Sequence, residues 1–168
     1  DFYAPQTFLD EQGRRILIGW MGIPDADYGN PTVDAGWQHA LTIPRELSFS
    51  KGRLIQKPLR ELGALRSGCR IYEDLAGLCA ESGIVYEAEL TFTECLRMEM
   101  KLREGVSLRY EGGHGEGGIL TLDLGEKGAG RKERPVRLDG LRGLQVFSDT
   151  SSLEIFVNGG EEVFTTRV

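Results

Sequence analysis

The sequence has few of the side chains that build metal sites and nucleophilic triads. Its 168 residues include only two histidines, His39 and His114. His114 lies in a glycine-rich turn and is expected to be a solvated loop residue; His39 lies on an expected strand, either as a structural residue or against a ligand. Neither has a second histidine at ligand spacing, so the sequence supports neither a metal site nor a Ser-His-Asp triad. We expect no metal and no cofactor.

Disulfide and membrane signals are also missing. The cysteines, Cys69, Cys79 and Cys95, are odd in number and show no paired spacing, which is typical of free thiols in a reducing compartment. The sequence has no run of 18 uncharged apolar residues, which excludes a spanning helix. Asp1 opens it without a starting Met or the pattern of a signal peptide. We expect a cytoplasmic location, no membrane partner, and a chain that begins inside a longer reading frame.

Charge of neither sign is in large excess. The 20 basic and 26 acidic residues give a formal net charge of −6, and the basic residues are dispersed among the acidic ones. This arrangement is typical of a solvated surface and not of a nucleic-acid footprint. The glycine-rich segment 112–118 lacks the following helix that a nucleotide cradle needs. We therefore expect no nucleic-acid partner.

The first part of the chain has short apolar runs separated by turn-forming residues. Residues 15–21 form a continuous apolar run, which predicts a buried strand, and residues 23–36 predict a polar loop. A second strand is expected over residues 37–43, ending at Pro44 because proline has no N–H to donate. Leucines at three-residue intervals predict a short helix within a linker at residues 57–66.

The second part of the chain shows strict alternation of apolar and polar residues. It is clearest in residues 84–92, 96–103 and 120–124, and it is the period of a half-buried antiparallel strand. The dipeptide at 158–159 is Asn-Gly, a strong hairpin signal because both residues accept positive φ. Repeated short strands of this kind indicate an all-β fold with an antiparallel β-sandwich over residues 67–168, lacking its last strand.

Aromatic and polar residues near the start follow no simple core period. Asp1, Tyr3 and Gln6 surround an Ala-Pro step, and Trp20 ends the first expected strand. Aromatic rings can cover the C–H faces of a sugar while carboxylates and amides bind its hydroxyls, so a sugar site is one interpretation. The alternative is that Trp20 and Trp37 belong to the core and that Asp1 is an exposed chain end.

Three blocks of sequence resemble a known family. DFYAPQTF at residues 1–8, followed by GRRILIGWM at 13–21, resembles the late propeller blocks of glycoside hydrolase family 32, the β-fructofuranosidases. WQHALTIPREL at 37–47 resembles the next segment, especially in members that hydrolyse sucrose-6-phosphate. DTSSLEIFVNGGEEVFTTRV at 149–168 is similar to the family's closing hairpin.

The resemblance implies the end of a five-bladed β-propeller over residues 1–56, a linker over 57–66 and a β-sandwich over 67–168. Family members cleave the fructosyl bond with retention, using two carboxyl groups that stand about 5 to 5.5 Å apart. They take the catalytic carboxylates from WMNDPNG-like, RDP and ECP motifs, none of which occurs here; Glu94-Cys95 is followed by Leu96 and is explained by a hairpin turn. No catalytic residue is therefore assigned, and the chain alone is expected to be inactive.

The resemblance also implies substrate-binding residues and partners. Asp1, Tyr3 and Trp20 match positions that line the fructosyl pocket, where they would shape the pocket and bind hydroxyls. The expected partner is sucrose or sucrose-6-phosphate bound by the complete propeller, with a possible homo-oligomer through the sandwich. Arg45 and Glu46 are expected to form a structural pair beside the linker. The basic residues available to a substrate phosphate are Arg14, Arg15 and Lys51.

Other functions remain open at this point. The parent protein would be a fructan hydrolase or a fructosyltransferase if its pocket accepted other fructosyl donors or acceptors. A different class of function is a non-catalytic carbohydrate-binding or oligomerising β-sandwich module.

Overall fold

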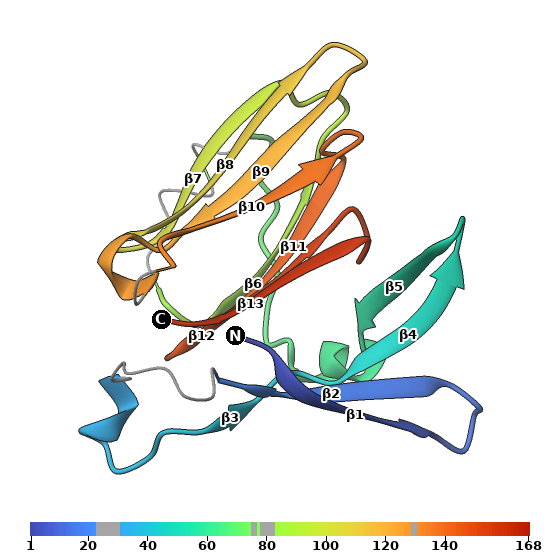
Figure 1. The fold of residues 1–168 in the computed structure, drawn as a ribbon, viewed down its shortest axis with the longest axis vertical. Coiled ribbons are helices and arrows are strands. Elements are labelled where there is room, and N and C mark those ends of the chain that lie inside the picture. The colour runs from blue at the N-terminus through green and yellow to red at the C-terminus, as the bar shows by residue number, and fades with distance from the viewer. Residues whose placement is uncertain (23–30, 75–76, 78–82, 129–130) are drawn as a thin grey trace.

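The computed structural model describes residues 1–168 except for 23–30, 75–76, 78–82 and 129–130 (Figure 1). The described part forms thirteen strands and three short 3-10 helices, so the expected all-β fold is confirmed. Most of the expected polar loop at 23–36, and also Cys79, lie outside the described residues. No helix in the described part is long and apolar enough to cross a membrane.

The first five strands form one antiparallel sheet, called here the N-terminal sheet. Its order is β1-β2-β4-β5, and the short β3 pairs with β2 next to β4. Of the strand expected over 37–43, only Ala40 and Leu41 pair with β2, and β4 starts after Pro44. The strands are β1 (Tyr3–Leu9), β2 (Arg15–Met21), β3 (Ala40–Leu41), β4 (Arg45–Ser50) and β5 (Arg53–Pro58), with a 3-10 helix η1 (Pro31–Val33) before β3.

The other eight strands form two four-stranded antiparallel sheets, called here the sheet pair. One sheet has the order β13-β12-β11-β6 and the other the order β10-β9-β8-β7. The first contains β6 (Tyr86–Thr91), β11 (Gly143–Asp149), β12 (Ser152–Val157) and β13 (Glu162–Arg167). The second contains β7 (Arg97–Arg103), β8 (Val106–Gly113), β9 (Gly117–Asp123) and β10 (Glu133–Leu138), with a 3-10 helix η3 (Gly125–Gly128) after β9.

The alternating residues of these strands fill the space between the two sheets. On the first sheet, Leu153, Ile155 and Val157 point inward and are fully buried. From the other sheet, Met98, Met100, Leu108, Leu120 and Leu122 meet them. Truncating such a leucine to alanine costs about 2–5 kcal/mol, so this core dominates the stability of the second part of the chain.

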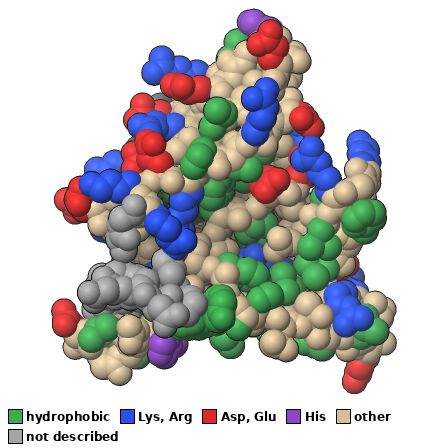
Figure 2. All heavy atoms as spheres, viewed as in Figure 1, with side chains coloured by type: hydrophobic (Ala, Val, Ile, Leu, Met, Phe, Trp, Pro, Cys, Tyr) green, Lys and Arg blue, Asp and Glu red, His purple; other side chains and the backbone are tan. Residues whose placement is uncertain are grey.

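The N-terminal sheet packs against the outer face of strands β12 and β13, and the two ends of the chain meet there (Figure 1). Because side chains alternate along a strand, the outer face carries the residues between the core leucines. These outward residues are Glu154, Phe156, Thr165 and Arg167, and they are buried beneath the N-terminal sheet. The space-filling view shows apolar side chains at the surface over the β4–β5 hairpin (Figure 2), where Phe49 and Leu54 are exposed.

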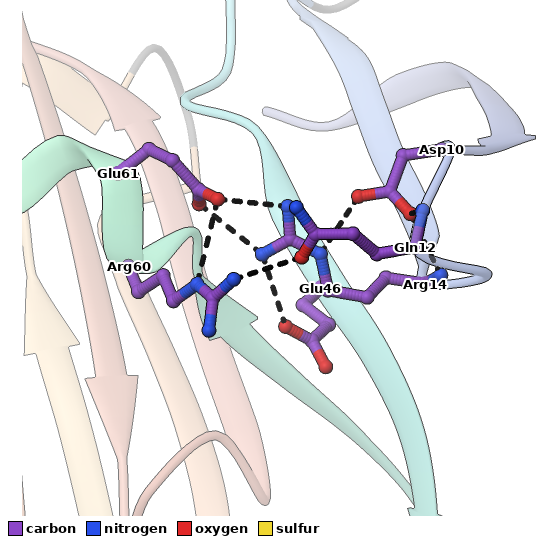
Figure 3. Close-up of polar contacts among 6 residues, drawn as sticks. All are labelled: Asp10, Gln12, Arg14, Glu46, Arg60 and Glu61. Carbon is purple, nitrogen blue, oxygen red and sulfur yellow. Dashed lines mark hydrogen bonds and ion pairs between the residues drawn. The ribbon is translucent and has the colours of Figure 1, made fainter.

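A cluster of charged residues ties the connecting 3-10 helix η2 (Arg60–Leu65) to the N-terminal sheet (Figure 3). Arg14 contacts Asp10 in its own hairpin, Glu46 in β4 and Glu61 in η2, at N–O distances of 2.7, 3.8 and 2.8 Å. Arg60 donates to the side-chain oxygen of Gln12 at 2.8 Å. The helix expected in the linker is therefore present, as a 3-10 helix held by ion pairs.

Candidate functional site

Three rings lie in a row at one end of the N-terminal sheet. A bulge in β1 between Tyr3 and Gln6, where Ala4 has φ of 45°, brings Tyr3 opposite Trp20 in β2. The two rings meet edge to face, with centroids 5.9 Å apart and planes at 71°. On the other side of Trp20 lies His39, with ring centroids 5.4 Å apart. The aromatic row is therefore Tyr3, Trp20 and His39.

The aromatic row is partly exposed, and Gly22 packs closely against its central ring, Trp20. Tyr3 is 51% exposed and Trp20 is half-buried, so both rings keep a surface that a ligand can reach. A Cβ atom on Gly22 would lie only 2.6 Å from the Trp20 ring, so the absence of a side chain at Gly22 lets the indole lie flat there. Trp20 is thus not a core residue of the described structure.

Asp1 points in a different direction from the aromatic row. Its carboxylate accepts hydrogen bonds from the guanidinium groups of Arg131 and Arg134, at 2.9 and 3.0 Å, and from Thr166 Oγ1 at 2.9 Å. It also accepts the backbone N–H of Arg167 at 3.1 Å. The side chain is 4% exposed, so Asp1 is a buried junction residue and not an exposed chain end.

A buried ion pair joins the N-terminal sheet to the sheet pair. Arg45 in β4 is 2% exposed and donates from Nη2 to Glu154 Oε2 in β12 at 2.5 Å. The same Nη2 lies 2.6 Å from Thr165 Oγ1, and Nη1 donates to Gln56 Oε1 at 2.8 Å. Burial raises the pKa of Glu154, an effect that the Arg45 charge opposes. The expected structural role of Arg45 holds, but its close partner is Glu154 and not Glu46.

A second buried cation reaches the segment before β3. Arg167 in β13 donates from Nη2 to Thr32 Oγ1 at 3.0 Å and from Nη1 to the carbonyl oxygen of Gln38 at 3.2 Å. Its guanidinium lies over the Trp37 ring, 4.9 Å from the centroid. Trp37 is 43% exposed, so this residue also lies outside the core.

Two family profiles match the chain. One, described as the glycosyl hydrolases family 32 N-terminal domain, matches residues 1–58, and the other, described as the family 32 C terminal, matches residues 80–168. The chain belongs to glycosyl hydrolase family 32. The resemblance of the three sequence blocks is thereby confirmed, and the aromatic row lies within the segment matched to the N-terminal family domain.

Curated relatives align with almost the whole of this family 32 chain but are much longer. Sucrose-6-phosphate hydrolase of Bacillus subtilis is 41% identical over 175 residues, covering 99% of this chain and 36% of that protein. The Salmonella typhimurium protein of the same name is 37% identical, covering 99% of this chain and 34% of its own length. The chain spans about a third of the length of these relatives.

Solved family 32 structures agree with the fold. Sucrose-6-phosphate hydrolase from Lactobacillus gasseri superimposes with a TM-score of 0.80 and 26% identity, covering 99% of this chain and 36% of that chain. A β-fructofuranosidase from Bombyx mori gives a TM-score of 0.64 at 24% identity, covering 100% of this chain and 36% of that one. Both likenesses extend over the N-terminal sheet and the sheet pair together.

The basic residues considered for a phosphate differ in their surroundings. Arg14 is held among three carboxylates, and hydrogen bonds to two of them, Glu61 and Asp10, raise its pKa, so its charge is already neutralised locally. Arg15 is exposed in β2, and Lys51 is exposed at the β4–β5 turn with φ of 49°.

The other candidate residues of this family 32 chain lie apart from the row. His114 is exposed at the β8–β9 turn, with Nδ1 3.1 Å from Glu94 Oε1, as a solvated loop residue would be. Cys69 and Cys95 are free thiols, and burial raises the pKa of Cys95. Within the described ranges, no group of three or more His, Cys, Asp or Glu side chains could hold a metal ion.

Sequence reasoning found two of the three rings and missed the residues that hold them. Tyr3 and Trp20 were matched by resemblance, and the structure brings them together. His39 joins them because β3 pairs with β2, with Leu41 opposite Trp20. Glu154 and Arg167 gave no local signal, because their partners lie more than a hundred residues away in sequence.

Proposed function

We propose that this chain is the C-terminal part of a glycoside hydrolase that cleaves the β-fructofuranosidic bond of sucrose-6-phosphate or sucrose. The observation that carries the proposal is the partly exposed Tyr3–Trp20–His39 row, inside a segment that matches the family's N-terminal domain. The names of the relatives support it, since those that align with nearly the full chain are sucrose-6-phosphate hydrolases.

The proposal divides the chain at the linker. Residues 1–56 are the end of the five-bladed propeller, 57–66 are the linker, and 67–168 are the β-sandwich without its last strand. The first profile match ends at 58, inside this linker, and the second begins at 80, which supports a division of the chain in this region. Among the described strands, β13 is the edge strand of its sheet and pairs only with β12, and Asp1 binds the Thr165 carbonyl oxygen and the Arg167 N–H on its other edge.

In this proposal the catalytic carboxylates lie outside the chain, and the reaction proceeds by retaining double displacement. The residues of this chain bind and orient. Tyr3 and Trp20 cover the C–H faces of the fructosyl ring, and His39 supports Trp20 from its other side. Asp1 anchors the first strand to the sheet pair, because its carboxylate oxygens already accept four hydrogen bonds. The chain alone should not hydrolyse sucrose.

The test is to express the complete reading frame that contains this chain and assay it on sucrose-6-phosphate, sucrose and inulin. Trp20→Ala should lower kcat/KM for the preferred substrate about 10- to 100-fold, since a ring contact of 1–3 kcal/mol is removed. Phe49→Ala is the matched control, because Phe49 is an exposed ring at the other end of the sheet. An unchanged kcat/KM for Trp20→Ala would refute the pocket assignment.

The same assay separates hydrolysis of a phosphorylated substrate from the related alternatives. A preference for sucrose-6-phosphate assigns the enzyme to the group of its named relatives, and inulin cleavage or fructosyl transfer points to the other family activities. We place the protein in the cytoplasm, which the free thiols of Cys69 and Cys95 support. Light scattering with and without residues 67–168 tests whether the sandwich forms a homo-oligomer.

A second candidate is a non-catalytic sugar-binding module, which the exposed rings of Tyr3 and Trp37 favour. Calorimetry of the chain with fructose, sucrose and short fructans tests it directly. Binding by the chain, combined with a complete reading frame that lacks any fructosyl-cleaving activity, would favour this module over the enzyme.

A further inference from the structure

The segment that carries His39 is held from both sides by buried side chains of the sheet pair. Glu154 of β12 holds the chain after His39, at Ile43, and Arg167 of β13 holds it before His39, at Gln38. Both residues are 3% exposed and lie on the outer face of neighbouring strands. One sheet therefore places a carboxylate and a guanidinium on either side of the same short segment.

The Glu154 contact continues to Trp20 by hydrogen bonds. Glu154 Oε1 accepts the backbone N–H of Ile43 at 2.7 Å. The preceding residue, Thr42, donates its N–H to the carbonyl oxygen of Gly19 at 2.9 Å, and its Oγ1 accepts the Gly19 N–H at 3.1 Å. Gly19 directly precedes Trp20, so these hydrogen bonds connect Glu154 to the backbone next to the indole.

The Arg167 contact acts on the other side of the His39 ring. Besides the carbonyl oxygen of Gln38, Arg167 binds Thr32 Oγ1 at 3.0 Å, and it is itself fixed by donating from Nε to Ser151 O at 3.1 Å. Gln38 is the neighbour of His39 in the chain. A short chain segment held at both ends cannot translate without breaking a buried charged hydrogen bond, each of which is worth about 1.5–3 kcal/mol.

We propose that Glu154 and Arg167 are positioning residues for the aromatic row, so that the sheet pair sets the placement of His39 against Trp20 and through it the affinity for the fructosyl unit. The part concerning affinity rests on the proposed function. A purely structural role predicts something different, namely lower stability with unchanged ring placement. The two roles can therefore be separated by observing the rings.

The first experiment uses the chain itself and needs no sugar. The measurement is an NMR spectrum in which the His39 ring and Trp20 indole signals are assigned. Glu154→Gln keeps a hydrogen-bond acceptor for the Ile43 N–H but removes the negative charge that Arg45 binds. Arg167→Lys keeps the positive charge but removes the guanidinium fork. Both should shift the His39 and Trp20 signals while the amide signals of β8 and β9 stay in place. Glu133→Gln is the control, because Glu133 pairs with Arg109 at 2.6 Å on the surface of the sheet pair.

Thr32→Val keeps the proposal testable if a buried-charge variant fails to fold. It removes one acceptor of Arg167 and changes no charge. His39 and Trp20 signals that stay at their wild-type positions in folded Thr32→Val and in either charge variant would overturn the proposal, whatever the loss of stability.

The second experiment measures affinity in the protein made from the complete reading frame. Thr32→Val and Glu154→Gln should raise KM about 3- to 10-fold with kcat changed less than about 2-fold, because the affected interactions bind substrate and transition state alike. A fall in kcat with unchanged KM would contradict the positioning of a binding row. If the wild-type protein shows no action on fructosides, the proposed function fails, while the ring signals still decide the positioning role.

Discussion

Gln56 in β5 donates its backbone N–H to the carbonyl oxygen of Gly160 at 3.0 Å, and this contact fixes the β12–β13 turn against the N-terminal sheet. Gly160 has φ of 97°, and a Cβ atom there would lie 1.9 Å from the Gln56 carbonyl oxygen. We expect Gly160→Ala to lower the free energy of unfolding by about 1–3 kcal/mol, from backbone strain and the forced separation.

The control for that variant is the neighbouring glycine. Gly159 also has positive φ, 72°, but nothing lies within 4 Å of its Cβ position. Gly159→Ala should therefore cost only the conformational strain, about 1 kcal/mol. Urea unfolding of both variants measures the difference, and equal losses would show that the Gln56 contact adds nothing.

The buried pair Arg45–Glu154 should show strong coupling. Arg45→Met leaves the Glu154 carboxylate buried without its counter-charge, and we expect a loss of about 3–5 kcal/mol. Glu154→Leu in the same protein removes that charge, so the double variant should lose less than the sum of the single losses by about 1–3 kcal/mol. Strict additivity in denaturant unfolding would contradict the pairing.

The attachment of η2 should depend on pH. Hydrogen bonds from Arg14 lower the pKa of Glu61 from 4.5 to about 2. Because the folded-state pKa lies below the ordinary value, this pair contributes stability above about pH 4.5 and loses it as the pH falls toward 2. Glu61→Gln should therefore lower Tm more at pH 6 than near pH 2, where Glu61 is about half protonated in the folded protein. Since Glu61 is half exposed, 0.5 M salt should also reduce the Tm difference between the wild-type protein and Glu61→Gln. A Tm difference that does not change with pH would exclude the ion pair as its cause.

The two parts of the chain should differ in local stability. Among the described residues before 47, the buried apolar side chains are Ile16, Leu17 and Met21, whereas seventeen buried residues form the core of the sheet pair. Tyr3, Phe8 and Leu41 of the N-terminal sheet are exposed. Hydrogen exchange should therefore be faster in the described part of residues 1–47 than in β8, β9 and β12. Equal protection in a monomer would disprove this.

Local pattern predicted the sheet pair well because each strand carries its own alternation. Leu153, Ile155 and Val157 face the core as their spacing requires, and Asn158 adopts φ of 51° in the expected Asn-Gly turn. The same reasoning overestimated the strand at 37–43, since the Trp37 ring packs on Arg167 instead of joining the sheet. A stacking partner 130 residues away leaves no trace in the local sequence.

The candidate site was predictable only in part, for the same reason. Family blocks identified Tyr3 and Trp20, but no sequence pattern indicated that Asp1 would be buried by Arg131 and Arg134. The partner of the Asp1 carboxylate is set by tertiary packing, which brings Arg131 and Arg134 next to it from more than a hundred residues away in sequence. Local sequence preferences carry no information about such a contact.

The bulge in β1 determines to which side of the sheet Tyr3 belongs. From Gln6 onward, paired residue numbers in β1 and β2 add up to 24, but Tyr3 and Trp20 add up to 23. If the register continued from Gln6 without the bulge, Ala4 would pair with Trp20 and Tyr3 with Met21, and the Tyr3 ring would lie on the opposite side, toward the sheet pair. The one extra residue that the bulge accommodates in β1 thus gives the row its first ring, without a change in any side chain that touches that ring.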